Sequence, residues 1–112
     1  MKDKTSESNR ENAESNRHEL DFLLDLENVL KQRKQTLPAG SYSTRLFKRG
    51  IDKIAQKLGE EAVEVVIASK NKKPSETINE SADLVYHLLV LLVEKDLSLT
   101  DVVRELKVRS KK

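Results

Sequence analysis

The chain has 112 residues, of which 36% are charged, 37% are hydrophobic and 4% are aromatic. Cysteine is absent, which excludes disulfide scaffolds, thiolate metal sites and cysteine nucleophiles. The formal net charge of +2 gives no support for binding to nucleic acid or to a membrane, and no apolar run approaches the roughly 20 residues that span a bilayer. We expect a cytoplasmic, all-α protein, because no signal peptide is apparent and three glycines and two prolines are too few for a turn-rich β fold.

The chain divides into a polar segment and one folded domain. In residues 1–19, Ala13 is the one apolar side chain after Met1, so this segment is expected to be a disordered polar tail. Residues 20–112 are expected to form the domain, beginning with a helix near Leu20 whose apolar residues recur at helical spacing.

Three further helical regions are expected after a break near Pro38. The first covers residues 43–70, with Gly50 as a candidate interruption. The next covers residues 75–95 after a short polar turn, and the last covers residues 98–109. No strand pattern and no internal repeat is apparent in the sequence.

The helix over residues 75–95 carries information about assembly. Between Leu84 and Val93 its apolar side chains surround the helix axis almost completely, and such a helix must be buried on all sides. A domain of this size has few residues with which to cover it. We therefore expect a homodimer in which the two longest helices of both copies form a shared bundle; a four-helix monomer is the alternative.

Carboxylates at i, i+3 spacing precede the apolar runs of both long helices. They are Glu61 and Glu64 in the first helix and Glu80 and Asp83 in the second. Side chains three residues apart are neighbours on a helix surface. If the two helices pack antiparallel across their connecting turn, both pairs face one seam at similar height.

Four carboxylates in one seam repel each other unless they are protonated or share a cation. Oxygen ligands suit a hard divalent ion, so Mg²⁺ is expected first and Mn²⁺ second. The alternative is a solvated acidic face with surface ion pairs to Lys53 and Lys57. Because these lysines lie on the same face and no glycine-rich phosphate loop is present, the residues predict metal-assisted hydrolysis of a phosphoanhydride.

Three segments resemble the phosphoribosyl-ATP pyrophosphatase family, one of the all-α, MazG-like nucleotide pyrophosphohydrolases. They are SYSTRLF at 41–47, KLGEEAVE at 57–64 and ESADLVYHLLV at 80–90. The resemblance implies a helical bundle in which two long central helices pair in a homodimer. It also implies Mg²⁺-dependent hydrolysis of phosphoribosyl-ATP to phosphoribosyl-AMP and pyrophosphate, the second step of histidine biosynthesis.

The resemblance assigns roles by motif position. The metal ligands would be Glu61, Glu64, Glu80 and Asp83. Glu60 would hold a second metal or orient the attacking water, which makes Glu60, Glu61 and Glu64 the catalytic set. The substrate-binding set would be Arg45, Lys53, Lys57, Lys70 and Asn71, with the four basic residues gripping phosphates.

Two features depart from the family pattern. The polar segment is additional, and Asp96 occupies a helix-ending position where glycine is expected. The companion phosphoribosyl-AMP cyclohydrolase is expected to be a separate protein. Two functions stay open as alternatives: a house-cleaning nucleoside triphosphate pyrophosphatase using the same metal site, and a non-catalytic helical dimerisation module. His87 is interpreted as a hydrogen-bonded core residue rather than a catalyst.

Overall fold

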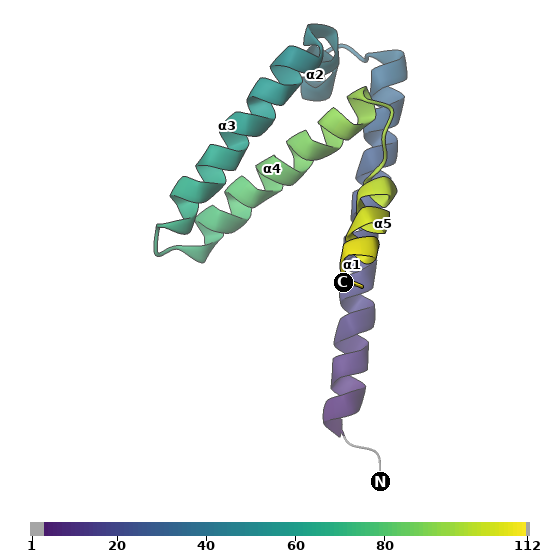
Figure 1. Ribbon diagram of the computed structural model, residues 1–112, viewed down its shortest axis with the longest axis vertical. Helices are drawn as coiled ribbons and strands as arrows, with labels where there is room; N and C mark the ends of the chain where they lie inside the picture. The colour runs from purple at the N-terminus through teal and green to yellow at the C-terminus, as the bar shows by residue number, and fades with distance from the viewer. Residues whose placement is uncertain (1–3, 112) are drawn as a thin grey trace.

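The computed structural model describes residues 4–111, which form five helices (Figure 1). The helices are α1 (Lys4–Thr36), α2 (Tyr42–Arg49), α3 (Ile51–Ser69), α4 (Pro74–Glu94) and α5 (Leu99–Arg109). No strand occurs within residues 4–111, which confirms the all-α fold class. None of the helices in this range is both long and apolar enough to cross a bilayer.

Helices α3 and α4 form an antiparallel hairpin that projects away from α1 (Figure 1). Pro74 occupies the first turn of α4, where its missing N–H costs no hydrogen bond. Near the turn, Thr77 Oγ1 donates a hydrogen bond of 3.3 Å to the backbone oxygen of Ala68. Ile54 and Ala68, two helical turns on either side of Glu61, are buried in α3. The predicted antiparallel packing of the two long helices is therefore confirmed.

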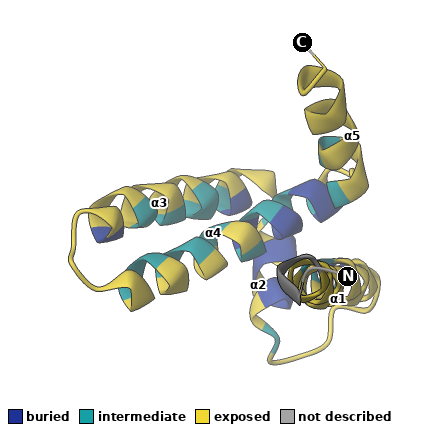
Figure 2. Cartoon of the chain, turned by 90° about the horizontal axis from the view of Figure 1, so that it is seen from below, coloured by how far each residue is buried: buried dark blue, intermediate teal, exposed yellow. Residues whose placement is uncertain are grey.

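The hydrophobic core lies where α1, α2 and the base of the hairpin meet. Its buried members are Leu30, Leu46, Phe47, Ile54, Leu89, Val90 and Val93. Figure 2 shows that buried residues gather in this region, whereas the distal part of the hairpin is exposed or half-buried apart from the buried Ala68, and most of α5 is exposed. The core therefore anchors only one end of the α3–α4 hairpin.

Polar contacts fix the end of α4 and the start of α5. Lys34 Nζ donates to the backbone oxygens of Val93 (3.2 Å) and Glu94 (3.0 Å). The carboxylate of Glu27, a buried residue, accepts a hydrogen bond of 2.6 Å from the Leu99 amide. Asp96 has φ +57°, so it adopts the left-handed conformation that the sequence pattern assigns to a glycine. These contacts hold the first turn of α5 against α1, while the rest of α5 has no buried residue.

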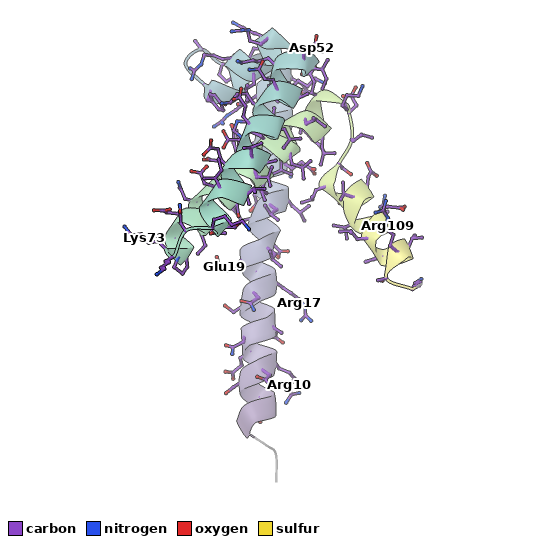
Figure 3. All side chains as sticks on the ribbon, turned by 60° about the vertical axis from the view of Figure 1, so that its left-hand side comes forward. Arg10, Arg17, Glu19, Asp52, Lys73 and Arg109 are labelled. Carbon is purple, nitrogen blue, oxygen red and sulfur yellow. The ribbon has the colours of Figure 1, made fainter. Side chains whose placement is uncertain are left out.

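The first helix begins at Lys4 rather than near Leu20. Residues 4–19 are therefore helical and not the disordered segment that their composition suggested; residues 1–3 lie outside the described range. Figure 3 shows Arg10, Arg17 and Glu19 projecting from this part of α1. Opposite charges at helical spacing, such as those of Arg10 and Glu14, favour a helix even without a buried face. Side chains from 7 to 19 are exposed apart from Ala13, as their polar composition predicts.

Apolar surface stays uncovered in the single chain. Val63 and Val66 of α3 are 57% and 60% exposed, and Ile78 of α4 is 69% exposed. A groove of about 650 Å³ between α1 and the first half of α4 is lined by Phe22 and Val85, among others. Within the apolar run 84–93 of α4, Val85 is 39% exposed, whereas Leu89, Val90, Leu92 and Val93 are buried in the single chain. The chain therefore covers most of this run by itself, and the expected homodimer stays a prediction.

Candidate metal centre

Three carboxylates converge on the inner side of the α3–α4 hairpin. Glu61 of α3 and Glu80 and Asp83 of α4 each place one carboxylate oxygen within 4.8 Å of the others. Glu61 reaches this point because it lies on the same α3 stripe as the buried residues Ile54 and Ala68. Glu80 and Asp83 occupy adjacent turns of α4. We call these three acids the carboxylate cluster.

Glu64 lies beside the carboxylate cluster rather than in it. Its side chain is exposed and lines a small cavity of about 130 Å³ together with Asn71, Glu76 and Glu80. Along α3 it is rotated by about 60° from Glu61, since each residue turns the helix by about 100°. Three of the four acids expected in one seam are thus brought together, and the fourth is a neighbour of Glu80.

The electrostatics of Glu80 show the repulsion that the sequence predicted. Partial desolvation raises the pKa of Glu80, and the negative charges of Asp83, Glu64, Glu61 and Glu76 raise it further. A carboxylate in this position is more stable when it is protonated or when a cation neutralises its neighbours. The carboxylate oxygens are hard ligands, so the donor set fits Mg²⁺ or Mn²⁺.

Lys57 connects the cluster with Glu60. Its ammonium nitrogen lies 3.7 Å from Glu61 Oε1 and 3.2 Å from Glu60 Oε2. Glu60 also accepts a 2.8 Å hydrogen bond from Gln56, and the hydrogen bonds from Gln56 and Lys57 lower the pKa of Glu60. The same hydrogen bond between Lys57 and Glu60 raises the pKa of Lys57, because it favours the charged ammonium group. Glu60 is 49% exposed, against 14% for Glu61, so it lies outside the carboxylate cluster.

The expected phosphate-binding residues fall at two ends of the hairpin. Lys53 lies on α3 one turn before Lys57, and the Arg45 guanidinium of α2 lies 5.5 Å from the centre of the Tyr42 ring. Lys70 and Asn71 follow the other end of α3 and are exposed, and Asn71 donates a 2.6 Å hydrogen bond to Glu76.

Two further residues are linked by hydrogen bonds to the backbone of Asp83 and were not predicted as site residues. Tyr42 Oη lies 2.8 Å from His87 Nε2, and His87 Nδ1 lies 2.7 Å from the backbone oxygen of Asp83. His87 is buried and hydrogen-bonded, as its sequence context predicts. Burial chiefly raises the pKa of Tyr42, which also feels the charges of Lys57 and Glu61. The only sequence signal for Tyr42 was its place in the SYSTRLF segment.

Fold and site together define an all-α protein whose central helical hairpin carries a carboxylate cluster suited to a divalent cation, with basic side chains towards both ends. Comparison with known sequences identifies the family, which fold and site alone do not. The chain belongs to the phosphoribosyl-ATP pyrophosphohydrolase family, whose model matches residues 23–110.

Two names recur among relatives of this chain. It is 52% identical over 90 residues to "Phosphoribosyl-ATP pyrophosphatase" of Leptospira biflexa, covering 80% of this chain and 98% of the relative. The protein of that name from Listeria welshimeri is 53% identical over 91 residues, which is 81% of this chain and 87% of the relative. "Histidine biosynthesis bifunctional protein HisIE" of Buchnera aphidicola is 45% identical over 98 residues, 88% of this chain and 46% of the relative. The chain therefore spans about half the length of this bifunctional relative.

Proposed function

We propose that the chain hydrolyses phosphoribosyl-ATP to phosphoribosyl-AMP and pyrophosphate, the second step of histidine biosynthesis. The observation that carries the proposal is the convergence of Glu61, Glu80 and Asp83 on one hairpin, within a family whose relatives bear the name of this activity. The Leptospira relative is matched over nearly its whole length, so the proposal does not require a further domain.

In this proposal Mg²⁺ is the cofactor and Mn²⁺ its substitute. Glu61, Glu80 and Asp83 would hold the ion, with Glu64 the next ligand along α3. Bound there, the ion would supply activation of water and neutralisation of charge on the departing pyrophosphate. Two observations support this assignment of the metal: the oxygen donors of the cluster and the raised pKa of Glu80. A bound cation would lower the pKa of Glu80 again, because it favours the charged carboxylate.

Basic side chains would bind the phosphates of the substrate. Lys57 is supported best, because its ammonium nitrogen lies 3.2 Å from Glu60 and 3.7 Å from Glu61 and its side chain is 26% exposed. Arg45 and Lys53 are placed at the same end of the hairpin, so we assign them to the same phosphate chain. Lys70 and Asn71, at the other end, are assigned to more distant parts of the substrate. Glu60 would hold Lys57 in place in addition to its expected part in catalysis.

We further propose that the active form is a cytoplasmic homodimer. The exposed apolar side chains of α3 and the groove between α1 and α4 support pairing with a second copy, because such surface is unfavourable in water. The bifunctional name of the Buchnera relative supports a link with a second enzyme of histidine biosynthesis. We assign that role to a separate phosphoribosyl-AMP cyclohydrolase.

The test is an assay of pyrophosphate release from phosphoribosyl-ATP and from a panel of nucleoside triphosphates, with Mg²⁺ and with EDTA. We expect release from phosphoribosyl-ATP alone, and none in EDTA. Preferential turnover of a nucleoside triphosphate would instead identify a house-cleaning pyrophosphatase. No turnover, together with no thermal shift in Mg²⁺, would identify a helical dimerisation module.

A further inference from the structure

We propose that Tyr42 and His87 are a positioning pair that holds the Arg45 guanidinium over the Tyr42 ring, so that their hydrogen bond sets the affinity for the phosphate chain. The inference rests on the proposed function, because Arg45 is assigned there to phosphate binding. Neither Tyr42 nor His87 is assigned contact with the substrate; both act through Arg45.

The hydrogen bonds have a definite direction. A backbone carbonyl can only accept, so His87 Nδ1 carries the proton that is donated to the Asp83 oxygen at 2.7 Å. His87 Nε2 is then an acceptor, and the Tyr42 hydroxyl donates to it at 2.8 Å. The chain of bonds runs from α2 to the backbone of Asp83, which is a residue of the carboxylate cluster.

The bond with His87 anchors the first turn of α2. Tyr42 is the first residue of this eight-residue helix, and Ser41 before it makes no side-chain capping bond to the helix. The Ser41 hydroxyl is hydrogen-bonded to that of Ser43 instead. The opposite end of α2 is held in the core by Leu46 and Phe47. The buried side chains of Ser43 and Thr44 also hold this turn, and the Tyr42–His87 bond is the hydrogen bond that ties the Tyr42 side chain to α4.

Arg45 follows Tyr42 by one helical turn, and its guanidinium lies over the Tyr42 ring at 5.5 Å from the centroid. The Tyr42 ring in turn packs against Tyr86 and His87, with centroid distances of 6.2 and 5.6 Å. The Tyr42 ring is thus the surface against which the Arg45 guanidinium packs. Fixing its hydroxyl fixes the ring, and with it the approach of Arg45 to an anionic substrate.

The test is a double-mutant cycle of Tyr42→Phe and Arg45→Ala in the full chain. Tyr42→Phe keeps the ring and removes only the hydroxyl. We expect it to raise KM for phosphoribosyl-ATP about fivefold, the factor for one net hydrogen bond, with kcat changed less than twofold. In the Arg45→Ala background the same change should have no further effect. The matched control is Tyr86→Phe, which removes a neighbouring hydroxyl without a hydrogen-bond partner among the described residues and should leave KM unchanged.

His87 variants separate the two hydrogen bonds. His87→Asn keeps a donor near Nδ1 and removes the acceptor for Tyr42, so it should raise KM as Tyr42→Phe does. His87→Gln places an acceptor near Nε2 and should restore most of the lost affinity. A fall in kcat at unchanged KM, a KM effect that persists without Arg45, or equal effects of Asn and Gln would each overturn the proposal.

Calorimetric binding of Mg²⁺ with inorganic tripolyphosphate supplies a readout that does not depend on turnover. Tyr42→Phe should weaken this binding about fivefold as well, and unchanged affinity would overturn the positioning role. If the wild-type chain leaves phosphoribosyl-ATP intact while tripolyphosphate binding still depends on Tyr42 through Arg45, the proposed function fails and the positioning pair stands.

Discussion

At the scale of single residues, the environment of Glu80 shows why a bound cation would stabilise the site. Four carboxylates surround it, and both its partial desolvation and their charges raise its pKa. A pKa that folding raises means that the folded state favours the protonated acid. The stabilising contribution of that proton is complete below the ordinary pKa and is lost as the pH rises through the higher, folded value. At neutral pH the metal-free chain therefore carries an unrelieved repulsion.

Replacement of Glu80 by glutamine should therefore stabilise the metal-free protein at neutral pH. In EDTA at pH 7.5 we expect Glu80→Gln to raise the Tm measured by circular dichroism, because it removes one of the repelling charges. The difference from wild type should shrink at pH 4, where the wild-type acid is largely protonated. In Mg²⁺ the order should reverse, since only the wild type gains stability from the ion. A Tm of the variant below that of wild type in EDTA would contradict this account.

Glu60 and Glu61 are adjacent in sequence but differ in environment, and their variants should differ accordingly. Glu61→Gln removes a member of the carboxylate cluster and should lower kcat/KM by at least about a hundredfold, because several kcal/mol of transition-state stabilisation depends on the ion. Glu60→Gln keeps a hydrogen-bond acceptor for Lys57 and should cost about tenfold or less. Steady-state kinetics at saturating Mg²⁺ would measure kcat/KM for both variants. Equal losses of kcat/KM would show that both acids touch the reacting groups.

At the scale of the helices, α5 depends on its first turn. The Ser98 hydroxyl accepts from the Asp101 amide at 3.2 Å, and the Asp101 carboxylate accepts from the Ser98 amide at 2.9 Å. This reciprocal capping stabilises the first turn of α5 itself. The Glu27–Leu99 bond and the packing of the half-buried Leu99 against the core attach that turn to the rest of the fold. The capping of α5 therefore depends on the charge state of the Asp101 carboxylate.

Acid should loosen the start of α5. The hydrogen bonds from Ser98 lower the pKa of Asp101 below its ordinary value of 3.8. The contribution of the carboxylate to stability is thus present above the ordinary value and is lost as the pH falls through the lower, folded pKa. NMR titration of the Asp101 carboxyl carbon should give that lowered pKa, and the Ser98 amide shift should follow it. In Asp101→Asn the Ser98 amide should no longer titrate; a titration that persists would point to another group.

The predictable parts of this fold are those that depend on neighbours in sequence. The α3–α4 hairpin follows from helical periodicity and Pro74, and the meeting of Glu61 with Glu80 and Asp83 follows from the antiparallel hairpin. The displacement of Glu64 depends on the rotation of α3 about its axis, which packing of Ile54 and Ala68 decides. The Tyr42–His87 bond joins residues 45 positions apart, so no local spacing reveals it. The helical start of α1 was missed because scarcity of apolar residues excludes a core but does not exclude a helix.

At the scale of the whole molecule, the chain is extended and leaves apolar faces open. Its extents are 59 × 34 × 34 Å, and the hairpin is anchored in the hydrophobic core at its base (Figure 1). The face of α3 that points away from α4 includes Val63 and Val66, both more than half exposed. A second copy that covered this face would give the hairpin the buried surroundings that its composition calls for.

A charge on that face should separate the copies. We expect light scattering after gel filtration to give twice the chain mass of 12.8 kDa for the wild type and the single mass for Val66→Glu. Thr100→Glu, at an exposed position of α5, is the control and should leave the mass doubled. A monomeric wild type, or a Val66→Glu protein that stays dimeric, would place the interface elsewhere or remove it.

All members of the carboxylate cluster come from one hairpin, within positions 61 to 83. The chain entropy lost in closing so short a loop is small, and contacts between near neighbours in sequence form early during folding. The ligand set can consequently assemble as soon as α3 and α4 meet, before α1 docks on the core. An ion captured at that stage would lower the kinetic barrier to folding by offsetting the mutual repulsion of the acids.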